Sequence, residues 1–241
     1  MRMTDGMGLV LFGDVVGSRR DSMGSTAWLR ELVVELDGVY GEARQARFGF
    51  TQGDELQGLL DPAADPFTAV LHAALGSGGR RMRWVAVRGA VDQDPAGEGP
   101  AGEDAAGRDA PATERTGPAF VAARQAIEEA RTGHERLVVI TGLAETYALL
   151  AELTPALVDM LDGLTERQRL VARLALIDDL RQSEVAERLN VRRATISVSF
   201  SRARIRSLQR LVAGIRRVYS SSWGLQTGAP GVPQPAQGET S

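Results

Sequence analysis

The chain has 241 residues, which is enough for one large domain or two small ones, and its formal net charge is −3. It contains no cysteine and no lysine, which excludes disulfides, thiol catalysis, cysteine-ligated metal centres, Schiff-base chemistry and the P-loop lysine. No apolar run approaches the ~18 residues that span a membrane, and no signal peptide opens the chain, so we expect a cytoplasmic protein without membrane contact.

The first part of the chain alternates predicted strands and helices. Residues 8–12 form an apolar run, which predicts a buried strand that ends in a turn. Residues 26–46 carry large apolar side chains at helical spacing, from Trp28 to Val39. Residues 47–60 predict two strands around a turn at Gln52–Glu55, which is the pattern of a β-hairpin.

The same alternation continues beyond the hairpin. Residues 67–75 predict a helix, and the alternating apolar residues of 82–91 predict a further strand. Residues 92–116 are rich in Gly, Pro, Ala and acidic residues, a composition that predicts a disordered loop. A helix over 117–131 and a buried strand over 137–141 follow.

This order of elements predicts an α/β or α+β domain over residues 1–141. We expect a helical connector over 142–163, made of two helices at 143–153 and 155–161 that Thr154 and Pro155 separate. The remainder of the chain is predicted to be helical, apart from a low-complexity tail.

Charge is divided unevenly along the chain. Residues 1–163 carry 15 arginines against 25 acidic residues, whereas residues 164–219 carry 13 arginines against 5 acidic residues. Residues 220–241 hold one acidic residue and are predicted to be a disordered tail. An acidic body joined to a basic module is the asymmetry expected when one part of a protein meets nucleic acid.

The basic module, residues 164–219, has the pattern of three short helices. Thr165 followed by Gln168 fits a capping box at the start of the first helix. The second helix starts near Gln182 and ends at Asn190, a residue that tolerates left-handed backbone angles. The third helix starts near Arg193, with Ile196, Phe200 and Ala203 facing inward.

That arrangement leaves hydroxyl and guanidinium groups of the third helix available to solvent. Arginine bonds guanine edges or phosphates, and serine and threonine reach either. A helix of this width fits the major groove. The predicted DNA-binding residues are Arg192, Arg193, Thr195, Ser197, Ser201, Arg202 and Arg204.

The segments LTERQR, QSEVAERLNV and ATISVSFSRAR resemble the helix-turn-helix of sigma-factor region 4 and of LuxR-type regulators. The resemblance implies DNA binding. This sequence departs from the families at Asn190, where they usually have glycine. Two alternatives remain: the basic module packs on the other domain, or it contacts another protein.

An apolar stripe follows the third helix and suits either internal packing or the seam of a homodimer. The stripe consists of Ile205, Leu208, Leu211, Val212, Ile215 and Val218.

Acidic residues gather in the N-terminal part. Asp14 follows the first strand, and Asp54 and Glu55 lie in the hairpin turn. If that strand lies beside the hairpin, the carboxylates of Asp14 and Asp54 converge, and two carboxylates suit Mg²⁺ with a nucleoside triphosphate. The alternative is that Asp14 caps a turn while the two hairpin residues are solvated.

The segments GDVVGSR, TQGDELQGLL and GPAFVAAR resemble the SatD family over residues 8–141, and through it class III nucleotide cyclases. The resemblance implies a ferredoxin-like, cyclase-like palm sheet. It also implies that Asp14 and Asp54 bind metal, and that a nucleotide ligand is bound at four further positions. Those positions are Gly17, Ser18, Glu55 and Arg124.

The cyclase resemblance breaks down at the catalytic positions. Val121 falls where these enzymes place a transition-state asparagine, and the purine-selecting lysine cannot exist in a lysine-free chain. We therefore assign no catalytic residue and expect a transcription regulator, with DNA as its partner and the N-terminal domain as a sensor or assembly module. A Mg²⁺-dependent cyclase-like enzyme and a protein-interaction module are the alternatives.

Overall fold

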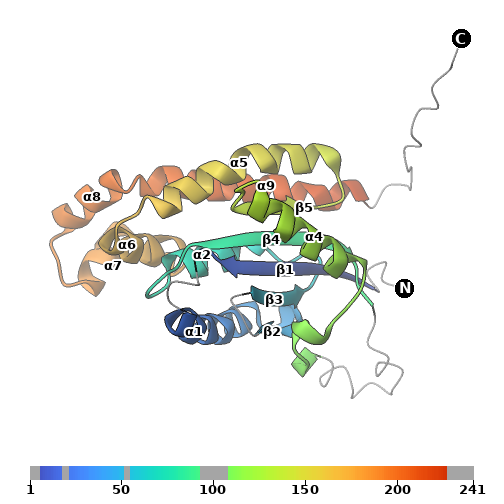
Figure 1. The fold of residues 1–241 in the computed structure, drawn as a ribbon. Coiled ribbons are helices and arrows are strands. Elements are labelled where there is room, and N and C mark those ends of the chain that lie inside the picture. Colours follow the sequence, from blue (N-terminus) through green and yellow to red (C-terminus); the bar gives the residue numbers. More distant parts are fainter. Residues whose placement is uncertain (1–5, 18–21, 52–54, 93–107, 227–241) are drawn as a thin grey trace, which may run out of the picture.

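A computed structural model shows the fold (Figure 1), and it describes residues 6–17, 22–51, 55–92 and 108–226. A mixed sheet with helices on both faces is followed by a helical C-terminal region, so the chain is α+β. Within the described residues, no helix combines the length and the apolar character that crossing a membrane requires.

The sheet has five strands in the order β2-β3-β1-β4-β5. Their bounds are β1 Met7–Val15, β2 Arg44–Phe50, β3 Glu55–Leu60, β4 Met82–Ala90 and β5 Leu137–Ile140. The first four strands pair antiparallel, and β5 joins β4 in parallel. With one helix after β1 and another after β3, these four strands have the β-α-β-β-α-β order of a ferredoxin-like fold, as predicted.

The two faces of the sheet have separate cores, because successive side chains of a strand point to opposite faces. Leu9 and Leu11 of β1 pack with the helices α1 (Ser22–Tyr40) and α2 (Pro66–Leu75). Val10 and Phe12 pack with α4 (Pro118–Thr132) on the other face, where the rings of Phe12 and Phe120 meet edge to face at 6.1 Å.

Two local contacts fix the outer part of the first face. The rings of Tyr40 and Phe48 stack with their centroids 5.6 Å apart. Phe48 lies directly over Gly58 of β3, where any side chain would collide with its ring, so glycine is required at this position. Val39, which we expected on the inner side of α1, is 44% exposed, because the buried side of the helix runs through Leu36 and Tyr40 and Val39 lies about 100° around the helix from Tyr40.

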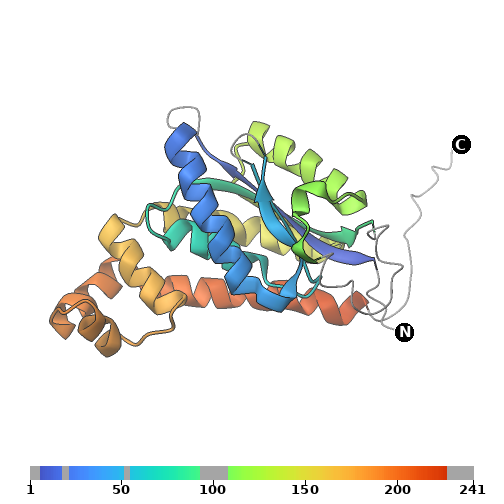
Figure 2. The ribbon, with the colours of Figure 1, turned by 90° about the horizontal axis from the view of Figure 1, so that it is seen from below.

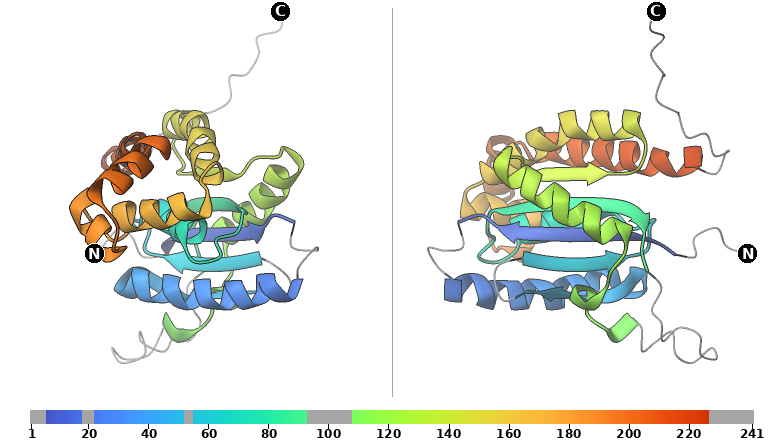
Figure 3. Two further views of the ribbon diagram at one scale, coloured as in Figure 1. Left: turned by 90° about the vertical axis from the view of Figure 1, so that its left-hand side faces the viewer. Right: turned by 45° about the vertical axis from the view of Figure 1, so that its right-hand side comes forward.

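The C-terminal region consists of five helices. They are α5 Ala144–Asp162, α6 Glu166–Leu176, α7 Gln182–Arg188, α8 Arg193–Arg202 and α9 Ile205–Gln226. Figure 2 and Figure 3 show α6, α7 and α8 gathered at one end of the sheet, while α9 runs back along the α/β domain. Buried residues of these helices and of the sheet form one continuous cluster, so the two parts of the chain share a core.

The connector is one helix rather than the two that we predicted. Pro155 lies inside α5, where its missing N–H leaves the carbonyl of Ala151 without its usual donor. Tertiary contacts compensate for this loss. The hydroxyl of Thr154 donates to the carbonyl of Leu137 at 3.1 Å, and Leu157 is fully buried against the core.

The predicted start of the tail at residue 220 is also wrong, because α9 continues to Gln226. The apolar stripe accounts for the length of this helix. Ile205, Leu208, Val212 and Ile215 are all buried within the chain. Of the two alternatives for the stripe, internal packing is therefore the correct one.

The predicted loop at 92–116 has structure in its second part. Ala112–Glu114 form the short 3-10 helix η3, and Pro111 makes an isolated bridge to Arg47. The hydroxyl of Thr116 donates to the carboxylate of Asp92 at 2.8 Å. Residues 93–107, the glycine-rich part of the predicted loop, lie outside the described residues.

Candidate nucleic-acid interface

The first helix of the basic module begins with the predicted capping box. The amide of Thr165 donates to Oε1 of Gln168 at 2.9 Å, and the amide of Gln168 donates to Oγ1 of Thr165 at 3.4 Å. Two N–H groups that lack partners within the helix are thereby satisfied. The capping box fixes the start of α6 directly after the end of α5.

The turn between α7 and α8 has the backbone that the sequence predicts. Asn190 adopts φ 50°, the left-handed region in which asparagine is among the tolerated residues. The next amide, that of Val191, donates to the carbonyl of Ala186 at 3.0 Å. The chain therefore reverses within a few residues, and α8 starts at Arg193 as expected.

Apolar side chains hold α8 in place. Ile196 and Phe200 of α8 and Ala203 after it are buried, and they meet Val185 and Ala186 of α7 in the shared core. The helix packs against α6, α7 and α9. One side of α8 is thus fixed by packing, which determines the side that faces outward.

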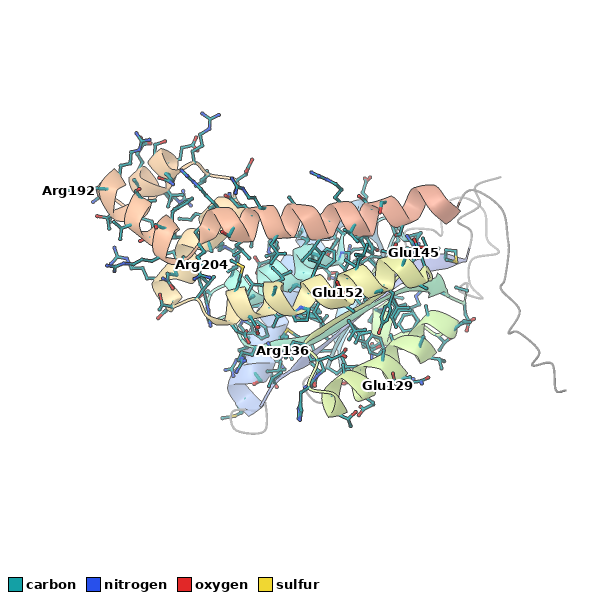
Figure 4. The ribbon with its side chains drawn as sticks, turned by 90° about the horizontal axis from the view of Figure 1, so that it is seen from above. Glu129, Arg136, Glu145, Glu152, Arg192 and Arg204 are labelled. Carbon is teal, nitrogen blue, oxygen red and sulfur yellow. The ribbon has the colours of Figure 1, made fainter. Side chains whose placement is uncertain are left out.

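The outward side carries the predicted DNA-binding residues. All seven of them, Arg192, Arg193, Thr195, Ser197, Ser201, Arg202 and Arg204, are exposed. Figure 4 shows Arg192 at the end of the molecule farthest from Glu145. The alternative in which this face packs on the acidic domain of the same chain is therefore wrong.

Arg204 differs from the other six in its position. It lies between α8 and α9 with φ 50°, an unusual conformation for a residue other than glycine. The sequence prediction placed Arg204 on the third helix and did not include this break. The break redirects the chain, so Arg204 stands at the end of the exposed face where α9 departs (Figure 4).

The comparisons with known proteins concern this same region. Residues 147–206 match the family described as Sigma-70, region 4. No curated protein and no solved structure matches the chain. The match starts within α5 and ends at the start of α9, so it extends the helix-turn-helix unit into the predicted connector. It supports a DNA-binding helix-turn-helix and is consistent with a transcription regulator.

An ion-paired cluster joins α6 to the α/β domain. Oε1 of Glu35 on α1 lies 2.8 Å from Nη2 of Arg173 on α6 and 2.8 Å from Nδ1 of His72 on α2. Burial alone would raise the pKa of Glu35, but the hydrogen bonds from Arg173 and His72 outweigh it and lower that pKa. His72 is buried, and its contact with Glu35 ties α2 to the ion pair between α1 and the basic module.

We expect Glu35→Gln to lower the free energy of unfolding at neutral pH by about 1 kcal/mol, a value reduced for the partial exposure of the pair. Because the pKa of Glu35 is lowered in the folded state, its contribution is present above the ordinary value of 4.5 and is lost as the pH falls below it. Denaturant unfolding between pH 3 and 7 measures both effects. Glu31→Gln, at an exposed position of the same helix, is the control. An unchanged pH profile for Glu35→Gln would contradict the prediction.

The long helix α9 has its own attachments to the α/β domain. The carboxylate of Asp65 caps α2 and also accepts from Nε of Arg216 at 2.8 Å. Three residues farther along α9, the ring of Tyr219 meets Phe67 edge to face at 5.8 Å. Nη2 of the buried Arg88 on β4 donates to the carbonyl of Thr141 at 2.8 Å and lies 3.5 Å from that of Ser222. The helix-turn-helix is therefore docked along the α/β domain, not joined to it by a free linker.

The second candidate site surrounds Asp14. Strand β1 lies beside the hairpin as the prediction required, and Asp14 is directly opposite Glu55 in the β1–β3 register. Oδ2 of Asp14 lies 2.9 Å from Nη1 of Arg83 and 3.3 Å from Nη2 of Arg131, and Asp14 is buried. Two guanidinium groups thus contact Oδ2 of this carboxylate and balance its charge.

The other residues predicted for this site are placed as follows. Gly17 is exposed with φ 78°, as a turn requires. Glu55 accepts from the side-chain amide of Gln57 at 2.8 Å. Arg124 is exposed on α4, about 10 Å along the helix from Arg131, which is the arginine that reaches Asp14.

Asp54 and Ser18 lie outside the described residues. The metal and nucleotide assignments therefore stay predictions. Within the described part of the chain, no three His, Asp or Glu residues are grouped so that they could hold a metal ion. Sequence reasoning missed Arg83 and Arg131. The one available signal was a pair of arginines, at positions 83 and 88, inside a strand that is otherwise apolar.

We expect Asp14→Ala to destabilise the fold by about 3–5 kcal/mol, because it leaves the buried Arg83 without its carboxylate. The double variant Asp14→Ala/Arg83→Met should recover part of this loss, since the unpaired charge is then gone as well. Thermal unfolding measures both variants, with Glu152→Ala on the exposed side of α5 as the control. If Asp14 instead binds metal, Mg²⁺ will raise the Tm of the unaltered protein and not that of Asp14→Ala.

Proposed function

We propose that this chain is a DNA-binding transcription regulator of SatD-like type, in which the N-terminal domain acts as a sensor or assembly module for the helix-turn-helix. The observation that supports DNA binding is the exposure of every predicted DNA-contacting side chain on α8 and at its two ends, in a region that matches sigma-70 region 4. Such a face presents donors to phosphates and base edges at the same time.

The charge distribution supports the same proposal. The basic module carries its excess of arginine apart from the acidic body, so a polyanion is drawn to one end of the protein. Arg206 and Arg210 of α9 are exposed just beyond Arg204 and extend the basic surface along the chain. Contacts from such arginines to the phosphates of the DNA backbone would set the register of the protein on DNA, but they would not read the base sequence.

A sensor or assembly role is supported by the docking of the helix-turn-helix. Glu35 contacts α6, and Asp65 contacts α9, so helices on one face of the sheet touch the basic module at two places. A ligand or partner that moved α1 or α2 would therefore change the position of the module. If a free linker joined the two parts of the chain, a movement of α1 or α2 would not change the position of the module.

The test is DNA-binding selection with the purified full chain, followed by measurement of affinity across a range of salt concentrations. We expect selective binding whose affinity falls steeply with salt, because arginine–phosphate contacts release counterions. The same measurement with and without Mg²⁺ and nucleoside triphosphates tests the sensor role, where a shift in affinity supports it. Flat salt dependence or the absence of any selected DNA would contradict the proposal.

A further inference from the structure

The side of α8 that faces away from the protein is defined by helix geometry. Ile196, Phe200 and Ala203, at spacings of four and three residues, are the buried positions. Ala194, Val198 and Ser201 have the same spacing, and each lies two residues before one of the buried positions. On a helix, a step of two residues is a rotation of about 200°. These three residues, all exposed, therefore form the centre of the outward side.

The side chains at the centre of this outward side are uncharged, and the arginines of α8 lie toward the two ends of the helix. Val198 is a large apolar side chain with 49% of its surface exposed. Arg193 lies to one side of it on the helix and Arg202 to the other. Ala194 and Ser201 are short, so they allow the helix backbone to come close to whatever surface it meets.

The hydroxyl groups near Val198 differ in their availability. Ser199 donates back to the carbonyl of Thr195 at 3.1 Å and is only partly exposed. Ser197 and Ser201 are exposed, and both lie toward the same flank of Val198, about 100° and 60° around the helix from it. The outward side therefore offers one branched apolar group with two hydroxyl groups beside it, and the nearest long basic side chain, that of Arg202, lies one turn farther along the helix.

We infer that Val198 determines specificity by packing against the C5-methyl group of thymine, so the module prefers DNA with thymine at the centre of its contact. This inference rests on the proposed function. In the major groove only thymine presents a methyl group, and apolar side chains are the groups that recognise it. The arginines at the margins then hold the phosphates on both sides of the groove.

Thymine-to-uracil replacement tests this contact directly, because uracil keeps the same hydrogen-bonding groups and lacks only the methyl group. Each thymine of a selected site is replaced singly by uracil, and the dissociation constant of the full chain is measured at fixed salt. For at least one central position we expect binding to weaken about fourfold, the value of one buried methyl group.

The decisive comparison uses the variant Val198→Ala. It should bind the thymine and uracil forms of that position equally, whereas Val34→Ala, at an exposed valine of α1, should keep the fourfold difference. If no replacement weakens binding, or if Val198→Ala keeps the full difference, the inference is overturned while DNA binding itself stands. If no DNA is bound at all, the proposed function fails first and the inference with it.

Discussion

Replacing both Arg193 and Arg204 by alanine is expected to weaken DNA binding by about 100-fold or more, because in the proposed complex each guanidinium group would make charge-assisted hydrogen bonds to DNA. The two residues stand at opposite ends of the exposed face, one at the start of α8 and the other after its end. The dependence of log K on log salt should also become shallower, by about 0.9 for each phosphate contact that is lost. Titration of labelled duplex at several salt concentrations measures both quantities.

The control for this variant removes the same charge from the α/β domain. Arg30 of α1 and Arg108 ahead of η3 are both exposed, so the double alanine variant at these positions lowers net charge without changing α8. If the two double variants lose affinity equally, binding depends on net charge alone, and the assignment of the interface to α8 is wrong.

Replacing Tyr219 by alanine should destabilise the protein by about 3–5 kcal/mol and lower the Tm by roughly 10 °C, since it empties a buried aromatic position between α9 and Phe67. The ring contact that this variant removes lies where α9 docks on the α/β domain. The variant should therefore also weaken any effect of a sensor ligand on DNA affinity. Thermal unfolding measures the first effect.

Tyr219→Phe separates the ring from the hydroxyl group. The hydroxyl oxygen is buried, none of the described residues gives it a hydrogen-bond partner, and burial raises the pKa of the group. Removing a buried polar group that has no partner is neutral or stabilising, by up to about 1 kcal/mol. A loss of more than 1 kcal/mol in Tyr219→Phe would show that the hydroxyl group has a partner after all.

Features with local causes could be predicted from the sequence. The capping box at Thr165, the left-handed turn at Asn190 and the inward positions of α8 each depend on residues only a few positions apart. The succession of strands and helices and the hairpin formed by β2 and β3 were also predicted from local patterns. Patterns of this kind set the helix-turn-helix, which is why the candidate interface was predicted better than the rest of the chain.

Features that depend on distant residues were missed. Arg83 and Asp14 are 69 positions apart, and nothing local indicates that they pair. The continuity of α5 through Pro155 results from packing against β5, which overrides the local penalty of proline. Val198 was overlooked for a different reason, since only polar residues were considered as contacts to DNA.

The length of α9 has a mechanical consequence. Its 22 residues span about 33 Å, from the residue after Arg204 to the neighbourhood of Arg88. If α9 and the helices packed on its first turns rotate together by 5° about the end near Arg88, the other end moves by about 3 Å, which exceeds the tolerance of a hydrogen bond to a base edge. A small tilt at the sheet would therefore be amplified into engagement or release of DNA at the opposite end of the lever.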